Sequence, residues 1–376
     1  MKKGVLMKQQ EIRISSHKAG MDEERLKNAF TILSREIEAK RIPGAAAVVG
    51  KKDLIAGSFA GGSIMIDETV NTPVNQDTIF DCASLTKVVI TLPLVLRLME
   101  QGLIELDEPV STYVPAFHKG AKSHVTIRHL LTHTSGLKPH IRNDFTNWKP
   151  EEAKAYIYSQ ELDHYPGKWV VYSDLGFIIL GDIIERILNQ PLDKAAEAYI
   201  LHPLGMVDTY FNPPDHLKSR IAATEYRRDL KRYQWGEVHD EKAYAFGGIS
   251  GHAGLFSTVG DLARYAQMWL NQGELGDALI FSPVTVENSI RNYTLLLNGN
   301  RGLGWVLKGD TLDASGDLFS QYSYGHTGFT GTSLWIDPEK DLFVVLLTNR
   351  VHLGRDHSIF RLRRVFHNAV MASAID

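Results

Sequence analysis

The sequence predicts a mixed fold of the α/β (α+β) class, in which an antiparallel sheet is assembled from both ends of the chain. Two apolar runs flank the polar pair Lys51-Lys52 within residues 44–62, and two more flank a turn within residues 333–349. Between these ends the apolar residues recur mainly with helical spacing. We therefore expect a sheet built from both termini, with a helix-rich lobe inserted in the middle.

Each predicted element has a local signal. Residues Asp22 to Ala39 have helical spacing, and their apolar face comprises Leu26, Ala29, Phe30, Leu33 and Ile37. Near the C-terminus, the four residues from Asp337 to Lys340 form a turn signal between two apolar strands, which predicts a hairpin.

The chain has no internal repeat, low-complexity tract or Pro/Ser-rich linker, which favours one domain. We expect an N-terminal extension at 1–20 and a single catalytic domain at 21–376. Its sheet lobe would comprise about 21–80 and 236–376, and its helical lobe about 84–235. A site is expected between the two lobes.

Composition limits the class of partner. The 376 residues are 44% hydrophobic and 23% charged, with a formal net charge of −3 and no long run of Lys or Arg, so nucleic acid is not an expected partner. The single cysteine, Cys82, excludes an internal disulfide, and a buried thiol is favoured over a reactive one. His129 and His133 have zinc-helix spacing but lack the glutamate of His-Glu-x-x-His, so neither a metal nor a cofactor is expected.

The N-terminal apolar run Gly4–Met7 is interrupted by Lys8. A secretory signal needs about 7–15 apolar residues and a membrane-spanning helix about 20, so neither is predicted. We expect a soluble cytoplasmic protein, or an extracytoplasmic one if a signal was removed.

The first candidate site motif is Ser84-Leu85-Thr86-Lys87, at the start of an apolar helix. Ser84 would lie where free N–H groups and the helix dipole favour a developing anion. Lys87 would share its face, and desolvation would favour the neutral amine that accepts a serine proton. The alternative is that Ser84 caps the helix and Lys87 is solvated.

Two further motifs supply partners. Tyr172-Ser173-Asp174 precedes another apolar helix, and a phenol beside an ammonium is a plausible proton shuttle. Asp174 has two possible roles, in the site or as a helix cap. His326-Thr327-Gly328 opens a predicted strand that could bind an extended substrate through its backbone.

These three motifs, in this order, resemble those of the serine β-lactamase and penicillin-binding protein superfamily. The chain is similar to the class C branch, which includes esterases, D-aminopeptidases and peptide hydrolases, from roughly Asp22 to the C-terminus. The segment Ile127–Leu137, "IRHLLTHTSGL", shares the resemblance.

The resemblance implies a β-lactamase/transpeptidase-like fold and a role for each motif. Ser84 would be the acylated nucleophile, Lys87 its base and Tyr172 the shuttle to the leaving group. The backbone N–H groups of Ser84 and Phe329 would form the oxyanion hole.

Two departures from the family pattern affect substrate choice. The second motif is usually Tyr-x-Asn, and ionised Asp174 can only accept hydrogen bonds. The third is usually Lys-Thr-Gly, whose lysine attracts a substrate carboxylate, whereas His326 would be charged only in part near neutral pH.

The stretch Gly236–Tyr265 resembles the branch that contains N-acetylmuramyl-L-alanine amidases. By this resemblance His239, Asp240 and His252 would lie near the site and bind a lactyl or sugar group. Alternatively, His239 and Asp240 form an internal pair and His252 is a satisfied loop histidine.

The sequence thus predicts a serine hydrolase that forms an acyl-enzyme on Ser84 and acts on a small-molecule substrate. An amide of a cell-wall muropeptide is the leading candidate, bound by Asp174, His326, Thr327, Gly328, His239 and His252. The alternatives are a carboxylesterase acting on acyl esters, and a penicillin-binding protein or weak β-lactamase that stays acylated by a β-lactam.

Overall fold

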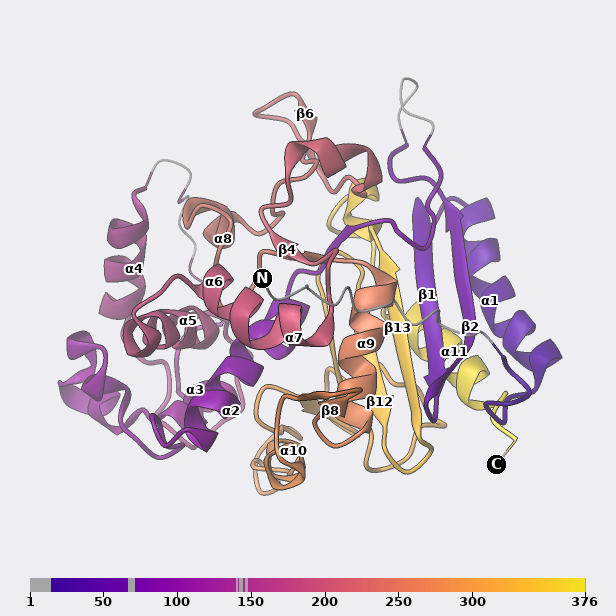
Figure 1. The fold of residues 1–376 in the computed structure, drawn as a ribbon. Helices are drawn as coiled ribbons and strands as arrows, with labels where there is room; N and C mark the ends of the chain where they lie inside the picture. The colour runs from indigo at the N-terminus through magenta and orange to yellow at the C-terminus, as the bar shows by residue number, and fades with distance from the viewer. Residues whose placement is uncertain (1–14, 67–71, 140, 142–144, 146–147, 376) are drawn as a thin grey trace, which may run out of the picture.

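The fold is built around a six-stranded antiparallel sheet (Figure 1). The computed structural model describes residues 15–66, 72–139, 141, 145 and 148–375. The strand order is β10-β11-β12-β13-β1-β2. The strands are β1 (Gly44–Lys51), β2 (Leu54–Gly62), β10 (Val306–Leu307), β11 (Tyr324–Thr327), β12 (Ser333–Asp337) and β13 (Leu342–Thr348).

Both ends of the chain contribute to this sheet, as the sequence predicts. Strand β1 pairs with β13, with Ala45 opposite Thr348, and on its other side with β2. The predicted turn lies between β12 and β13, where Asp337 pairs with Leu342. Strands β1 and β13 are buried along their whole length, because helices cover both faces of the sheet.

Two helices cover one face of the sheet, α1 (Glu23–Glu38) and α11 (Phe360–Met371) (Figure 1). Asp22 caps α1, because its carboxylate accepts a hydrogen bond of 2.9 Å from the N–H of Arg25. The opposite face packs on α9 (Val259–Leu270), which contacts β1, β12 and β13. The predicted N-terminal helix is therefore confirmed to within one residue at each end.

The segment between the sheet strands forms the helical lobe, whose core is continuous with the α9 side of the sheet. Its helices are α2 (Leu92–Glu100), α3 (Ile127–Leu131), α4 (Pro150–Ser159), α5 (Asp174–Leu188), α6 (Leu192–Ala196) and α7 (His202–Leu204). Helix α5 is buried from Leu175 to Ile184, which holds its first residue, Asp174, in a fixed place.

Smaller elements connect the lobes. A three-stranded sheet has the order β3-β7-β4. The remaining strands and α-helices of the described residues are β3 (Phe80–Asp81), β4 (Tyr210–Phe211), β5 (Tyr226–Arg227), β6 (Arg232–Tyr233), α8 (Glu241–Ala245), β7 (Leu255–Ser257), β8 (Glu274–Leu275), β9 (Ala278–Leu279) and α10 (Pro283–Ser289). Because β3 lies directly before Ser84, the small sheet anchors the nucleophile segment.

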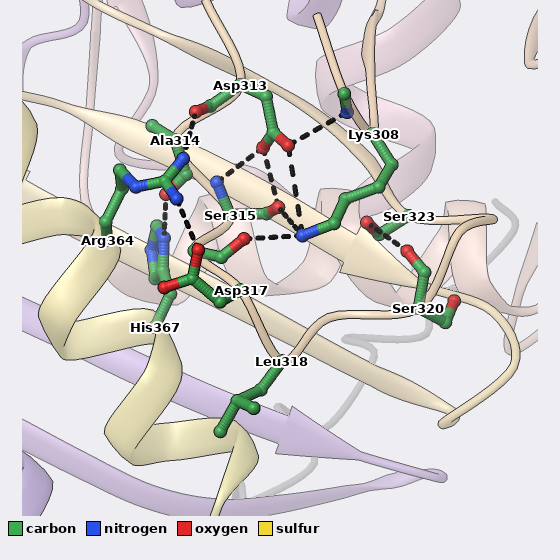
Figure 2. A network of polar contacts seen from close by, with 12 residues as sticks. Lys308, Asp313, Ala314, Ser315, Asp317, Leu318, Ser320, Ser323, Arg364 and His367 are labelled. Carbon is green, nitrogen blue, oxygen red and sulfur yellow. Dashed lines mark hydrogen bonds and ion pairs between the residues drawn. The ribbon is translucent and has the colours of Figure 1, made fainter.

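A polar network ties the loop after β10 to α11 (Figure 2). The ammonium of Lys308 lies 3.1 Å from Ser315 Oγ and 3.8 Å from Asp313 Oδ2. On α11, His367 Nδ1 donates to the carbonyl of Ala314 at 2.7 Å, and Arg364 pairs with Asp317. The short edge strand β10 is thereby held beside β11, which carries the third motif.

Within the part of the chain that the structure describes, every helix is too short or too polar to cross a lipid bilayer.

Candidate active site

The nucleophile segment begins in a strained turn. Ala83, directly before Ser84, has φ of +46°, a left-handed conformation that side chains other than glycine rarely adopt. The turn is held because the N–H of Ala83 donates to Asp81 Oδ1 at 2.8 Å. A π-helical turn, Lys87–Thr91, then leads into α2. Both features are typical of functional sites, where packing maintains an unfavourable backbone.

Lys87 joins the first two motifs. Its ammonium lies 2.9 Å from Ser84 Oγ and 2.8 Å from Asp174 Oδ1, and it donates to the carbonyl of His252 at 3.1 Å. Its side chain is 0% exposed, so the alternative of a solvated lysine is wrong. The predicted neighbourhood of Ser84 and Lys87 is therefore present, with Asp174 as a third member.

The charge state of Lys87 differs from the expectation. Burial lowers the pKa of its ammonium, but the Asp174 carboxylate and Tyr172 outweigh burial, and the net pKa is raised. The pKa of Asp174 is held low, because Lys87, His252 and Lys242 outweigh the burial that would raise it. In the free enzyme Lys87 and Asp174 are thus an ion pair, and desolvation alone does not give a neutral amine.

Asp174 does not cap its helix. Ser173 occupies the N-cap position, and its hydroxyl donates to the carbonyl of Lys138 at 2.7 Å. Asp174 is the first residue of α5, and its carboxylate turns to Lys87. Of the two roles left open by the sequence, the structure places Asp174 within the site.

Tyr172 lies among cations and imidazoles. Lys87 Nζ is 5.0 Å and Arg301 Cζ 5.9 Å from the centre of its ring. The ring centres of His133 and His326 lie 4.5 and 5.9 Å away. Cations over the face of an aromatic ring are attracted to it, so this surrounding fixes Tyr172 beside the Ser84–Lys87 pair.

His129 and His133 have separate structural contacts. His129 Nδ1 accepts the N–H of Thr126 at 3.2 Å and completes the cap of α3. His133 Nδ1 accepts the N–H of Ser173 at 3.1 Å, and this hydrogen bond helps to fix the backbone of the second motif. With its Nδ1 committed as an acceptor, His133 is a support for Tyr172.

The third motif packs directly against the nucleophile segment. Thr330 Oγ1 donates to the carbonyl of Asp81 at 2.6 Å and Thr332 Oγ1 to that of Cys82 at 3.0 Å. Thr327 ends β11 beside this contact and is partly exposed. Cys82 is buried, and burial raises the pKa of its thiol, which agrees with the inert thiol favoured by the sequence.

Gly328 is required by this close approach, which gives a testable prediction. A Cβ on Gly328 would lie 2.0 Å from Thr332 Oγ1 and 2.5 Å from the Cys82 carbonyl. Gly328→Ala should therefore destabilise the fold by about 1–3 kcal/mol and lower kcat/KM, measured by denaturant unfolding and ester hydrolysis. The control is Gly260→Ala, whose Cβ would meet nothing nearer than 3.9 Å; equal stability of the two variants would contradict the packing argument.

His326 is neutral, which corrects the expectation of partial charge. Burial, followed by the nearby cations Lys87 and Arg301, lowers its pKa to about 3. Its Nδ1 donates to the carbonyl of Thr327 at 2.8 Å, which leaves Nε2 as a hydrogen-bond acceptor. Nε2 is buried and has no partner among the described residues.

Phe329, the predicted oxyanion residue, is 48% exposed at the rim of the site. The centre of its ring lies 5.8 Å from the centre of the His239 ring and 4.5 Å from Arg350 Cζ. The assignment of the Ser84 and Phe329 N–H groups to an oxyanion hole stays a prediction.

His239 and Asp240 do not pair with each other. The Nε2 of His239 lies 3.0 Å from Glu225 Oε2, and its backbone N–H donates to Asp81. The Nε2 of His252 lies 2.8 Å from Asp240 Oδ1, and its Nδ1 lies 2.8 Å from Ser250 Oγ. With a ring that is 1% exposed and engaged on both nitrogens, His252 has no free side-chain atom for a sugar or lactyl group.

Three groups of this cluster are close enough to share a metal ion. One ligand atom each from Asp174, Asp240 and His252 lies within 4.8 Å of the others. However, Lys242 Nζ lies 3.4 Å from Asp174 Oδ2 and 3.7 Å from Asp240 Oδ2, and Lys87 pairs with Asp174 as well. Lysine ammonium groups already balance both carboxylates, so the residues fit an ion-pair network better than a metal site.

Three residues of the site were missed or misjudged from the sequence: His133, Lys242 and Arg301. Arg301 is buried and pairs with Asp310 at 3.0 Å. Lys242 lies in the stretch that carries the family resemblance, so it could have been considered there. Arg301 is in a loop without a motif, and nothing in its neighbouring residues indicates that it reaches Tyr172.

Comparisons with known proteins agree with this geometry. The family model described as Beta-lactamase matches residues 27–367. A protein of Escherichia coli O157:H7 with the provisional name D-alanyl-D-alanine carboxypeptidase is 33% identical over 380 aligned residues, covering 90% of this chain and 85% of the relative.

Solved structures share the fold. A class C β-lactamase superposes with a TM-score of 0.74 at 21% identity, covering 93% of this chain and 97% of that structure. EstCE1, a hydrolase with promiscuous acyltransferase activity, superposes with a TM-score of 0.73 at 22% identity, covering 93% and 99%. The chain therefore belongs to the β-lactamase family and is a serine hydrolase of the β-lactamase and penicillin-binding protein superfamily.

Proposed function

We propose that the protein hydrolyses an amide bond of a small peptidoglycan-derived substrate through an acyl-enzyme on Ser84, with N-acetylmuramyl-L-alanine as the preferred type. The observation that carries the proposal is the buried contact of 2.9 Å between Lys87 Nζ and Ser84 Oγ. A nucleophile within hydrogen-bond reach of a base that is itself oriented by a third group, here Asp174, is the arrangement required for covalent catalysis.

The reaction follows from the positions of these groups. The Lys87 ammonium first loses its proton to solvent while Asp174 stays ionised, and the resulting amine accepts the proton of Ser84 as Oγ attacks the substrate carbonyl. The oxyanion would be bound by the backbone N–H groups of Ser84 and Phe329. Tyr172 donates a proton to the departing amine and recovers one from Lys87. Water then attacks the acyl ester, releasing the acid and restoring Ser84.

The charge of the third motif supports the choice of substrate. The family's lysine at this position attracts a substrate carboxylate, whereas His326 is neutral and presents an acceptor at Nε2. A substrate that offers an N–H or O–H group to Nε2 is favoured there. Muropeptides carry such donors on the sugar and the amide.

The test compares three substrates at equal concentration: N-acetylmuramyl-L-alanine, a peptide ending in D-alanyl-D-alanine, and a short acyl ester. We expect release of alanine from the first substrate to be the fastest amide hydrolysis. Turnover of the ester without release of alanine would favour a carboxylesterase. Faster release of the terminal residue from the second substrate would favour a carboxypeptidase.

A second candidate function rests on the ion pair of Lys87 and Asp174. An anion at 2.8 Å holds the lysine protonated, and a protonated lysine cannot act as a base for deacylation. Both acylation and deacylation would then be slow, and an adduct formed with a reactive β-lactam would persist, as on a penicillin-binding protein. Intact-mass measurement after exposure to a β-lactam distinguishes the candidates, since a lasting adduct on Ser84 favours this one and rapid clearance favours the hydrolase.

A further inference from the structure

A second lysine, Lys242, lies within the ion-pair network behind the nucleophile. It is on α8, far in sequence from Ser84, and its side chain is 14% exposed. Its ammonium lies 3.4 Å from Asp174 Oδ2, whereas Lys87 contacts Oδ1 of the same carboxylate at 2.8 Å. The two lysines therefore share one carboxylate from opposite oxygens.

We propose that Lys242 is a positioning residue that adjusts the basicity of Lys87 by sharing the charge of Asp174. This inference rests on the proposed role of Lys87 as the base. Coulomb energies add, so the positive charge of Lys242 offsets part of the attraction between the Asp174 carboxylate and the Lys87 ammonium. Lys242 thus makes it easier for Lys87 to release a proton.

Lys242 is held in place by a chain of buried contacts. Asp240 caps α8, accepting the N–H groups of Lys242 and Ala243 through Oδ1, while its Oδ2 lies 3.7 Å from Lys242 Nζ. His252 Nε2 fixes the Asp240 carboxylate at 2.8 Å, and the carbonyl of the same His252 accepts from Lys87. Lys242 and Lys87 therefore belong to one connected network of hydrogen bonds and ion pairs.

The other charged or titratable groups around Lys87 do not replace this effect. Lys87 Nζ lies 5.0 Å and Arg301 Cζ 5.9 Å from the centre of the Tyr172 ring, and Arg301 is neutralised by Asp310. His326 and His133 face the same region, and burial lowers the pKa of both imidazoles, so that they are neutral. His252 also faces Asp174, but its Nε2 is engaged with Asp240 at 2.8 Å. Among the described residues, Lys242 is the lysine in contact with Asp174 besides Lys87.

The sign of the effect follows from electrostatics. Without Lys242, the whole charge of Asp174 acts on Lys87, whose pKa rises further, so the free amine forms only at higher pH. Without the charge of Asp240, Lys242 pairs with Asp174 alone and Lys87 becomes easier to deprotonate. Removing Lys242 and removing Asp240 should thus have opposite consequences.

The experiment measures kcat/KM against pH for Lys242→Gln and Asp240→Asn. We expect the acidic limb to move up by about one pH unit in the first variant and down in the second, since a charge within about 4–6 Å shifts a pKa by 1–3 units. Asparagine keeps the oxygen that caps α8. The control Lys194→Gln removes the same charge from an exposed pair with Glu197 and should leave the profile unchanged.

A third variant separates position from charge. Lys242→Ala assayed with added methylammonium should recover the wild-type limb if an ammonium in this space is what matters. Coincident profiles for Lys242→Gln and Lys194→Gln, or shifts of the same sign for Lys242→Gln and Asp240→Asn, would overturn the proposal. Failure of the proposed function is recognised separately, because turnover would then survive in Ser84→Ala.

Discussion

Ser84→Ala is expected to lower kcat/KM by at least about 10³-fold while the protein stays folded. In the proposed reaction this hydroxyl forms the acyl bond, and Lys87 Nζ lies 2.9 Å from it. Loss of Oγ removes a partner of the Lys87 ammonium but leaves the Asp174 pair intact, so little stability should be lost. Hydrolysis of a chromogenic ester and thermal unfolding measure the two effects.

The control for Ser84→Ala is Ser159→Ala, which removes an exposed hydroxyl that donates to the carbonyl of Tyr156. It should retain wild-type turnover. Intact-mass measurement with a slow acylating substrate should show an adduct on the wild type and on Ser159→Ala, and none on Ser84→Ala. Retained turnover in Ser84→Ala would show that Ser84 is not the nucleophile.

Asp174→Asn should destabilise the fold by about 3–5 kcal/mol near neutral pH, because it leaves the buried Lys87 ammonium without its anion. The folded pKa of Asp174 is depressed, so its contribution to stability is present above its unfolded pKa and is lost as pH falls below about 4. The difference in the free energy of unfolding between the wild type and Asp174→Asn should therefore become smaller as the pH falls. Urea unfolding at several pH values measures it.

The matched control for this variant is Asp107→Asn, which breaks an exposed ion pair of 2.7 Å with Arg128. An exposed pair contributes about 0–1 kcal/mol, so its loss should be small. Equal losses in the two variants would show that burial does not strengthen the Asp174 contact. The acidic limb of kcat/KM should also move to lower pH in Asp174→Asn, since Lys87 then loses the anion that holds its proton.

Local signals were sufficient for much of the fold. The helix after Asp22 was predictable because its cap and apolar face lie within one segment, and the β12–β13 hairpin because its turn residues join two apolar runs. The small sheet β3-β7-β4 was not predicted, because its strands are two or three residues long and pair segments that are distant in sequence.

In the site, too, features with a local sequence signal were predictable, whereas features that depend on distant segments were not. The order of the three motifs identified Ser84, Lys87 and Tyr172, and the structure brings them together. The protonation of Lys87 could not be predicted, because it depends on Asp174 and Lys242, which approach it from α5 and from α8. The loss of charge on His326 likewise depends on burial that no local pattern reveals.

The pairing of β1 with β13 has a consequence for synthesis on the ribosome. Ala45 is opposite Thr348, so the N-terminal hairpin emerges long before the strand that completes it. Until then β1 exposes an unpaired apolar edge, the kind of surface that invites aggregation. The third motif is fixed by the same late strands, so an interrupted chain would lack both a closed sheet and a competent nucleophile. We therefore expect chaperones that act during synthesis to bind mainly to the hairpin of β1 and β2.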